Sequence, residues 1–233
     1  MVAVFLLLAA GMESAAAQED FTGVWQAFAS ERPAGAGSDP TLTAEGQAKV
    51  DAWFAEQGDN YVESGSYCVP HGMPTTMTAL VSYPIEIIHS RNRITMLAEL
   101  EMQMRRIFMD GRDFPEDHPH TRMGYSIGHW DDETLVIETA LLTEFLERNW
   151  PRTEGTTIVE RVYRTTRDAS PPALGYVQAN DSDEILAIEI TVTDPALYPE
   201  PQQITMYFQR IPDDSFLEYD CAAELWYNAL AGE

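Results

Sequence analysis

Short runs in which apolar and polar residues alternate, separated by turn residues, limit the fold of this chain more than any other feature. A period of two places successive side chains on opposite faces of a β-strand. Strands at regular spacing joined by turns indicate an all-β fold, an antiparallel barrel or sandwich. The predicted strands span residues 21–25, 81–89, 93–100, 102–109, 124–130, 134–139, 156–167, 184–193, 202–211 and 216–221.

Two helices are expected beside the strands. Residues 42–57 are typical of a helix, because Thr43 suits the N-cap, Glu45 lies in the first turn and Gly58 can end it. Residues 140–148 are predicted to form a short helix over the mouth of a barrel. The sequence shows neither a repeat nor a second domain, and residues 18–233 are of a length that suits one domain.

The run from Ile94 to Phe108 predicts two different faces of the sheet. Its even-numbered positions are apolar and rich in Met, with Arg106 embedded among them, whereas its odd-numbered positions include Glu99 and Arg105. The plain interpretation is a core face and a solvent face. The functional interpretation is that Arg106 reaches into a ligand cavity, where a buried charge needs a carboxylate partner. Candidate partners on other strands are Glu138, Glu160 and Glu189.

The first residues predict export from the cytoplasm. Residues 2–10 are an apolar run of the length of a signal-peptide core, too short for a membrane-spanning helix. Ala15 and Ala17 fit the small-residue cleavage pattern, so residues 1–17 are expected to be removed and the mature chain to begin at Gln18. No Lys or Arg precedes the apolar run, and the alternative is a short buried strand or helix.

Export also bears on the two cysteines, Cys68 and Cys221. In an oxidising compartment an even number of cysteines favours a disulfide bond. The bond would join the C-terminal region to the loop before the first long strand. The alternative is two separate free thiols.

The charge balance argues against several classes of partner. The chain has 14 Lys and Arg against 38 Asp and Glu, a formal net charge of −24. Such a charge repels nucleic acids and anionic membrane surfaces, and no other segment approaches the length of a membrane span. Lys49 is the only lysine, which disfavours Schiff-base chemistry. No motif for NAD, FAD or ATP is present, so no cofactor is expected.

Five residues are candidates for acid–base chemistry. His129 is the candidate general acid or base, because a histidine titrates near the working pH. Tyr125 and Arg106 are candidates to stabilise a developing negative charge. Glu99 or Glu160 would orient these groups.

Four residues are candidate substrate contacts. His71 lies close to Cys68 in a loop stiffened by Pro and Gly. The other three are Met102, Met104 and Trp130, whose large apolar side chains suit a hydrophobic ligand.

Two further motifs are weaker. His118 and His120 flank Pro119 and could hold a metal ion, but the proline suggests an exposed loop, and no metal is predicted. Ser126 has the G-x-S-x-G spacing of a nucleophile elbow. The strand–turn–helix that such an elbow requires is missing from the predicted elements, so a serine hydrolase is not favoured.

Seven segments occur together in a fixed order: C-x-P-x-G-x-P from Cys68, RRIFMDGR from Arg105, GYSIGHW from Gly124, TLVIET from Thr134, Glu160-Arg161, Asp194-Pro195 and EYxC from Glu218. This set resembles a large, mostly uncharacterised family of exported bacterial β-rich proteins, frequent in sphingomonads and acidobacteria. The sequence departs from that family at Phe114 and Tyr125, where histidines are common. The pair Gly23-x-Trp25 is similar to the lipocalin signature and implies a lipocalin-like barrel that holds a ligand.

These observations lead to two main hypotheses. The first is a cofactor-independent acid–base enzyme, a lyase, dehydratase or isomerase, acting on a hydrophobic or aromatic small molecule inside the barrel. The resemblance makes plant-derived aromatic dimers a substrate class, with a deformylating lyase of lignin-derived dimers as one example. The alternative is an exported, lipocalin-like binding protein for an apolar ligand. A structural protein of the cell envelope is the third interpretation.

Overall fold

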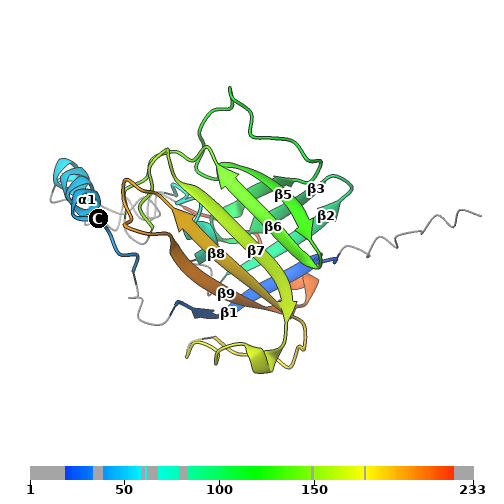
Figure 1. Ribbon diagram of the computed structural model, residues 1–233. Helices are drawn as coiled ribbons and strands as arrows, with labels where there is room; N and C mark the ends of the chain where they lie inside the picture. Colours follow the sequence, from blue (N-terminus) through cyan, green and yellow to red (C-terminus); the bar gives the residue numbers. More distant parts are fainter. Residues whose placement is uncertain are drawn as a thin grey trace, which may run out of the picture.

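Nine strands, taken in chain order, close into one barrel (Figure 1). The computed structural model describes residues 19–33, 39–58, 61, 68–78, 83–147, 150–175 and 177–222. The strands are β1 (Gly23–Glu31), β2 (Pro84–Ser90), β3 (Arg93–Ala98), β4 (Gln103–Phe108), β5 (Tyr125–Asp131), β6 (Thr134–Ala140), β7 (Thr157–Thr165), β8 (Ile185–Thr193) and β9 (Gln202–Ile211). Because β1 pairs with both β2 and β9, the sheet has no open edge and the predicted barrel is confirmed. The predicted signal peptide, residues 1–17, lies outside the described residues.

Two predicted elements are wrong. Residues 216–221 form no strand, because the chain leaves β9 through a short 3-10 helix, η4 (Asp213–Ser215), and then runs without regular structure to Cys221. Residues 140–147 form no helix, and residue 148 lies outside the described part. After β6 the chain turns at Leu141, whose φ is 57°, and then exchanges two backbone hydrogen bonds between Phe145 and Arg152, at 2.9 and 2.8 Å. Tertiary pairing therefore overrides the helical pattern of this segment.

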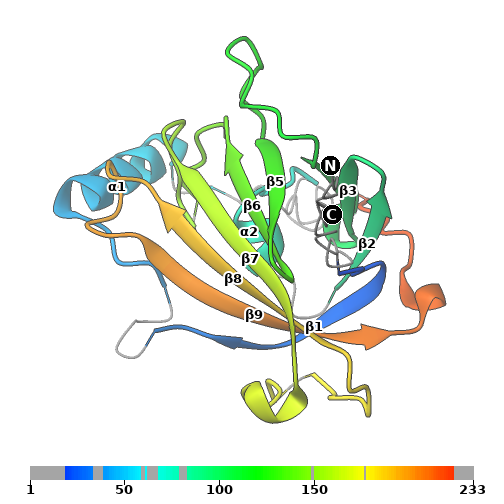
Figure 2. The same cartoon turned by 45° about the vertical axis from the view of Figure 1, so that its right-hand side comes forward.

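The predicted N-terminal helix is confirmed as α1 (Ala44–Gln57). The Thr43 hydroxyl accepts a hydrogen bond from the Gly46 amide at 2.9 Å, the expected N-cap. Gly46 faces the backbone of Leu197, where a Cβ would lie 2.6 Å from the carbonyl oxygen. Figures 1 and 2 show α1 beside one end of the barrel, next to the connection between β8 and β9. A second, four-residue helix, α2 (Thr75–Thr78), follows Cys68.

One strand pair corrects the prediction of an entirely antiparallel barrel. β4 and β5 pair in parallel, whereas all other neighbours in the barrel are antiparallel. The segment between them, residues 109–124, must return along the barrel before β5 begins, since parallel neighbours need a crossover. It stands out from the top of the barrel in Figures 1 and 2.

The predicted apolar face of even-numbered residues between Ile94 and Phe108 is correct for β3 but wrong for β4. A 3-10 helix, η2 (Leu100–Met102), separates β3 from β4 and turns the chain back on itself. In this hairpin Ile94 pairs with Ile107 and Met96 with Arg105, so the inward positions are even in β3 but odd in β4. Arg105 is consequently buried, whereas Arg106 is exposed. Met102 and Met104, expected on the inner face, are each 47% exposed.

Cys68 and Cys221 form a disulfide bond, as predicted. The bond joins residues 153 positions apart in the sequence, which in the chain-entropy account stabilises the fold by about 5 kcal/mol. Disulfides of this kind are typical of oxidising compartments. In the described residues no helix is long and apolar enough to cross a membrane.

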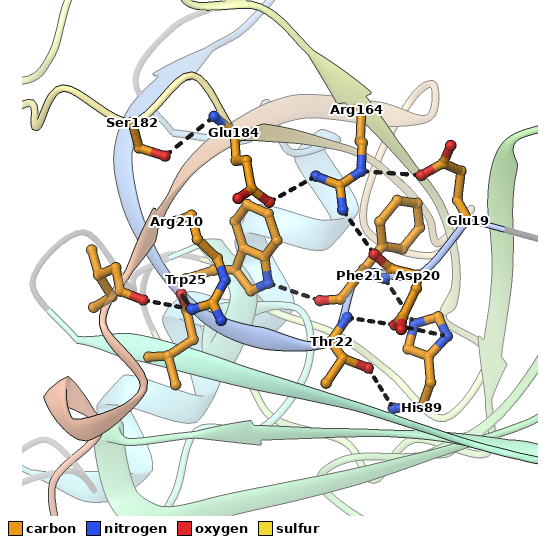
Figure 3. A network of polar contacts seen from close by, with 12 residues as sticks. Glu19, Asp20, Phe21, Thr22, Trp25, His89, Arg164, Ser182, Glu184 and Arg210 are labelled. Carbon is orange, nitrogen blue, oxygen red and sulfur yellow. Dashed lines mark hydrogen bonds and ion pairs between the residues drawn. The ribbon is translucent and has the colours of Figure 1, made fainter.

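The barrel end at which β1 begins is closed by a polar network around an indole (Figure 3). Trp25 is fully buried and donates its Nε1–H to the Phe21 carbonyl at 2.9 Å. The guanidinium carbons of Arg210 and Arg164 lie 5.7 and 5.8 Å from the indole ring. Gly23 has a φ of 136° and passes so close to Arg210 that a Cβ would lie 2.2 Å from its Cζ. These contacts explain why glycine occupies position 23 and tryptophan position 25.

We expect removal of the disulfide to weaken the fold strongly. A Cys68→Ala/Cys221→Ala variant should lose about 2–5 kcal/mol of unfolding free energy in urea, because its unfolded chain is no longer cross-linked. Reduction of the wild type should reproduce this loss and leave the variant unchanged. An unchanged urea midpoint would contradict the stabilising role of the bond.

His89 lies at the same end of the barrel, and its surroundings lead us to expect that the free energy of unfolding depends on pH. Burial lowers the pKa of His89 from its usual 6.5, and the nearby Asp20 carboxylate opposes this only in part. The backbone amide of Phe21 also donates to His89 Nε2 at 3.4 Å, a bond that the doubly protonated ring cannot accept. The folded state therefore binds fewer protons than the unfolded state, and stability is lost as the pH falls below about 6.5.

A His89→Gln variant isolates this effect. Its unfolding free energy, measured in urea between about pH 7 and pH 5, should fall less steeply with decreasing pH than that of the wild type. The exposed His129, changed to Gln in the same way, provides the control. Equal slopes in all three proteins would remove His89 as the cause.

Candidate functional site

The parallel ladder between β4 and β5 is short and leaves an opening. It contains two residue pairs, Ile107 with Ser126 and Phe108 with Ile127, whereas the antiparallel ladder of β5 and β6 contains seven. A cavity of about 370 Å³ lies at this seam, within the size range of small-molecule pockets. The cavity is lined by Met104, Arg105, Arg106, Phe108, His118, Thr121, Arg122, Met123, Gly124, Tyr125 and Ser126.

Arg105, one of the lining residues, belongs to a buried ion pair. Arg105 and Glu160, with side chains 2% and 0% exposed, form a bidentate pair through both terminal nitrogens of the guanidinium. Two further N–H groups of Arg105 donate to Ser126 Oγ at 2.9 Å and Thr139 Oγ1 at 2.6 Å. Glu160 thus neutralises Arg105, and four of the five guanidinium N–H groups are used within the protein.

Two other arginines bring positive charge that the protein leaves unpaired. Arg106 is exposed, and within the described chain its guanidinium has neither a hydrogen bond nor an ion pair. Arg122 packs on Phe145, with its Cζ 5.3 Å from the ring centroid, and its buried Nη1 has no hydrogen-bond partner in the described residues. The fully buried Arg152 packs on the same ring, and burial, with the charge of Arg122, lowers the pKa of Arg152 to about 10.

An aromatic cluster forms one wall of the cavity. The rings of Phe108 and Tyr125 are stacked, with centroids 5.0 Å apart, and Phe114 reaches Tyr125 from the side at 6.3 Å. Arg112 lies over Phe108 and donates to the Tyr125 hydroxyl at 3.2 Å. Hydrogen bonds from Arg112 also lower the pKa of Asp110, so this arginine is already held by a carboxylate.

His118 meets the cavity next to Tyr125. The two rings are T-shaped, with centroids 4.9 Å apart. His118 Nδ1 lies 2.7 Å from the Pro119 carbonyl, and His120 Nδ1 lies 2.9 Å from the Leu142 carbonyl. A carbonyl only accepts, so both rings carry the proton on Nδ1. Among the described residues no group of three or more His, Cys, Asp or Glu is placed to hold a metal ion.

The five predicted acid–base residues do not meet at one point. Tyr125 and Arg106 line the cavity, and Glu160 lies directly beneath it. His129 is exposed on β5, on the opposite face of the strand from Ser126. Glu99 accepts a hydrogen bond from the Leu217 amide at 2.6 Å and serves the C-terminal segment.

The predicted substrate contacts are also dispersed. Met104 lines the cavity, while Met102 is exposed and accepts a hydrogen bond from the Tyr219 amide. Trp130 packs on Phe21 at the closed end, with centroids 5.6 Å apart. His71 lies between two carboxylates, Nδ1 3.3 Å from Glu101 and Nε2 3.6 Å from Glu147.

The sequence analysis missed several residues of the site. Arg105 was assigned to the wrong face, and His118 was considered only as a metal ligand. Arg122 and Met123 carry no motif, and only the position of the crossover brings them to the cavity. Ser126 is 1% exposed and hydrogen-bonded to Arg105 and Thr139, so its hydroxyl is a structural group here.

Comparison with models of known protein families and with curated proteins finds no match to this chain. The resemblance to the family of exported bacterial proteins therefore stays a prediction.

The Arg105–Glu160 pair predicts a large stability effect. Glu160→Gln leaves a buried guanidinium without its counter-charge, which should cost about 3–5 kcal/mol of unfolding free energy. The next residue on β7 offers a matched control, since Arg161 pairs with Asp131 on the surface. Arg161→Gln should change stability by less than about 1 kcal/mol. Urea unfolding measures both, and equal effects would contradict the assignment.

Proposed function

We propose that this protein is an exported binding protein for a small molecule with an apolar body and a negatively charged group, held in the cavity between β4 and β5. The observation that carries this proposal is the charge of the lining. None of the 11 lining residues is Asp or Glu, although the chain has 38 of them. Three of its 14 basic residues gather there instead.

Only two of these three arginines are free to meet a ligand. Arg105 is neutralised by Glu160, which leaves Arg106 and Arg122. No carboxylate in the described residues is paired with Arg122, which lines the cavity, so its positive charge can attract an anion bound there. Guanidinium groups suit carboxylate and phosphate oxygens, to which they can donate two parallel hydrogen bonds.

The rest of the lining favours an aromatic or otherwise apolar body. Phe108 and Tyr125 present ring surfaces, and Met104 and Met123 supply polarizable, adaptable side chains. At the packing density of an organic liquid, a 370 Å³ cavity holds a molecule of about 200 Å³. A planar aromatic carboxylate meets all of these conditions.

The proposed ligand site lies in the wall of the barrel, whereas the sequence analysis expected the ligand in its interior. The interior side chains of β1, β8 and β9 include Trp25, Ile188 and Phe208, each fully buried and packed together in the core. Export is part of the same proposal, supported by the disulfide bond and by the predicted signal peptide.

Binding of trans-cinnamate, measured by titration calorimetry, tests the proposal. Cinnamate should bind more tightly than about 1 mM, and the neutral cinnamamide should bind at least about 10-fold more weakly, because it lacks the charge that the arginines meet. Arg106→Gln and Arg122→Gln should each weaken cinnamate binding by about 10-fold.

Arg91 supplies the matched control, since it is an exposed arginine in the β2–β3 turn, outside the cavity lining. Arg91→Gln should bind cinnamate like the wild type. Equal binding of cinnamate and cinnamamide, or equal losses in Arg91→Gln and Arg106→Gln, would reject the cavity as an anion site.

A further inference from the structure

The cavity contains a histidine whose neutral tautomer is set by a hydrogen bond within the protein, and we propose that His118 catalyses proton transfer on the bound anion. This inference rests on the proposed anion site. The reaction we assign is the keto–enol interconversion of a carboxylate that carries an acidic C–H next to a carbonyl group. An aryl 2-oxo acid is the simplest such molecule.

The base follows from the hydrogen bond at the other ring nitrogen. His118 Nδ1 donates to the Pro119 carbonyl at 2.7 Å, so in the neutral ring Nε2 carries a lone pair and no proton. The bond also holds the ring in place beside Tyr125. An imidazole with a free Nε2 at a small-molecule cavity is suited to take a proton from carbon.

Stabilisation of the developing oxyanion follows from the groups on the same lining. Arg106 has free donors, and Arg122 adds a second positive charge to the same lining. The Tyr125 oxygen accepts a hydrogen bond from Arg112, so its own O–H remains available to donate. Donors directed at an oxygen that gains charge in the transition state are the largest single contribution in many enzymes.

The step balances within the substrate and these side chains. The C3–H bond breaks, its proton passes to His118 Nε2, and its electron pair forms the C2–C3 double bond. The carbonyl electron pair moves to oxygen, which takes the proton of the Tyr125 hydroxyl. His118 then releases its proton to water and Tyr125 regains one from water. The net change is an isomerisation that needs no oxidant, reductant or cofactor.

Hydrogen–deuterium exchange of phenylpyruvate tests the inference. Proton NMR in D2O follows loss of the C3 signals, which should be faster with wild-type protein than in buffer alone. His118→Gln should lower the protein-dependent rate by at least about 100-fold, the contribution typical of a positioned base. Tyr125→Phe keeps the aromatic wall but removes the hydroxyl, and should lower the rate by about 100-fold.

His120→Gln is the matched control for His118→Gln. His120 lies in the same loop and has the same tautomer, but it is not part of the cavity lining. It should retain the wild-type exchange rate. Cinnamate binding, measured on every variant, shows whether the cavity is intact, and His118→Gln should still bind cinnamate.

The outcomes separate the two proposals. Cinnamate binding without accelerated exchange by the wild type would overturn catalysis and leave the anion site standing. Loss of exchange in His129→Gln but not in His118→Gln would also overturn it, in favour of the base expected from the sequence. Absence of both binding and exchange would remove the proposed function together with this inference.

Discussion

The barrel depends on one guanidinium group at its weakest seam. β4 and β5 share two ladder pairs, fewer than the neighbouring β5–β6 pair, so backbone hydrogen bonds alone hold this part of the wall loosely. Arg105 compensates from the inside, because its side chain extends from β4 to Ser126 on β5, Thr139 on β6 and Glu160 on β7. A buried ion pair gives little net stability against a hydrophobic substitute, but it is costly to break. The contribution of Arg105 therefore lies in the cost of losing one of its partners on β5, β6 or β7.

The same arrangement accounts for the cavity. A parallel neighbour requires the chain to return along the barrel, and the returning segment, residues 109–124, brings His118, Arg122 and Met123 to the opening. The Arg105–Glu160 ion pair lies between the opening and the barrel core, and Glu160 neutralises the charge of Arg105 alone. The positive charge that no carboxylate compensates at the β4–β5 seam is therefore that of Arg106 and Arg122. The short β4–β5 ladder, bridged from within by Arg105, thus leaves a pocket in the barrel wall that combines apolar side chains with positive charge.

The sequence predicted most of the strands, because their alternation survives in the structure. It also predicted the Thr43 cap and the disulfide, which depend on local chemistry and on composition. The predictions from the sequence were wrong where a tertiary contact determines which side chains face the core. The inward positions change parity at Leu100–Met102, since Glu101 and Met102 adopt positive φ values of 59° and 48° that alternation does not reveal.

The site was predictable in part for the same reason. Tyr125 and Arg106 were identified by residue type, and both line the cavity. Arg105 and Arg106 differ by one position, and a one-residue change of register exchanges the buried and the exposed arginine. The role of His118 depends on a parallel strand pair and a crossover path, neither of which has a signature in one sequence.

The net charge of −24 bears directly on the proposed anionic ligand. At long range the protein repels an anion, but salt screens that repulsion beyond about 8–10 Å. Within about 4 Å, one guanidinium at a protein surface attracts an anion by about 4 kcal/mol before desolvation is counted. The local attraction must therefore exceed the screened repulsion of the remaining surface. A single Asp or Glu on the lining would cancel one of the two free arginines, so the lack of acidic residues among the lining residues supports the proposed anion site.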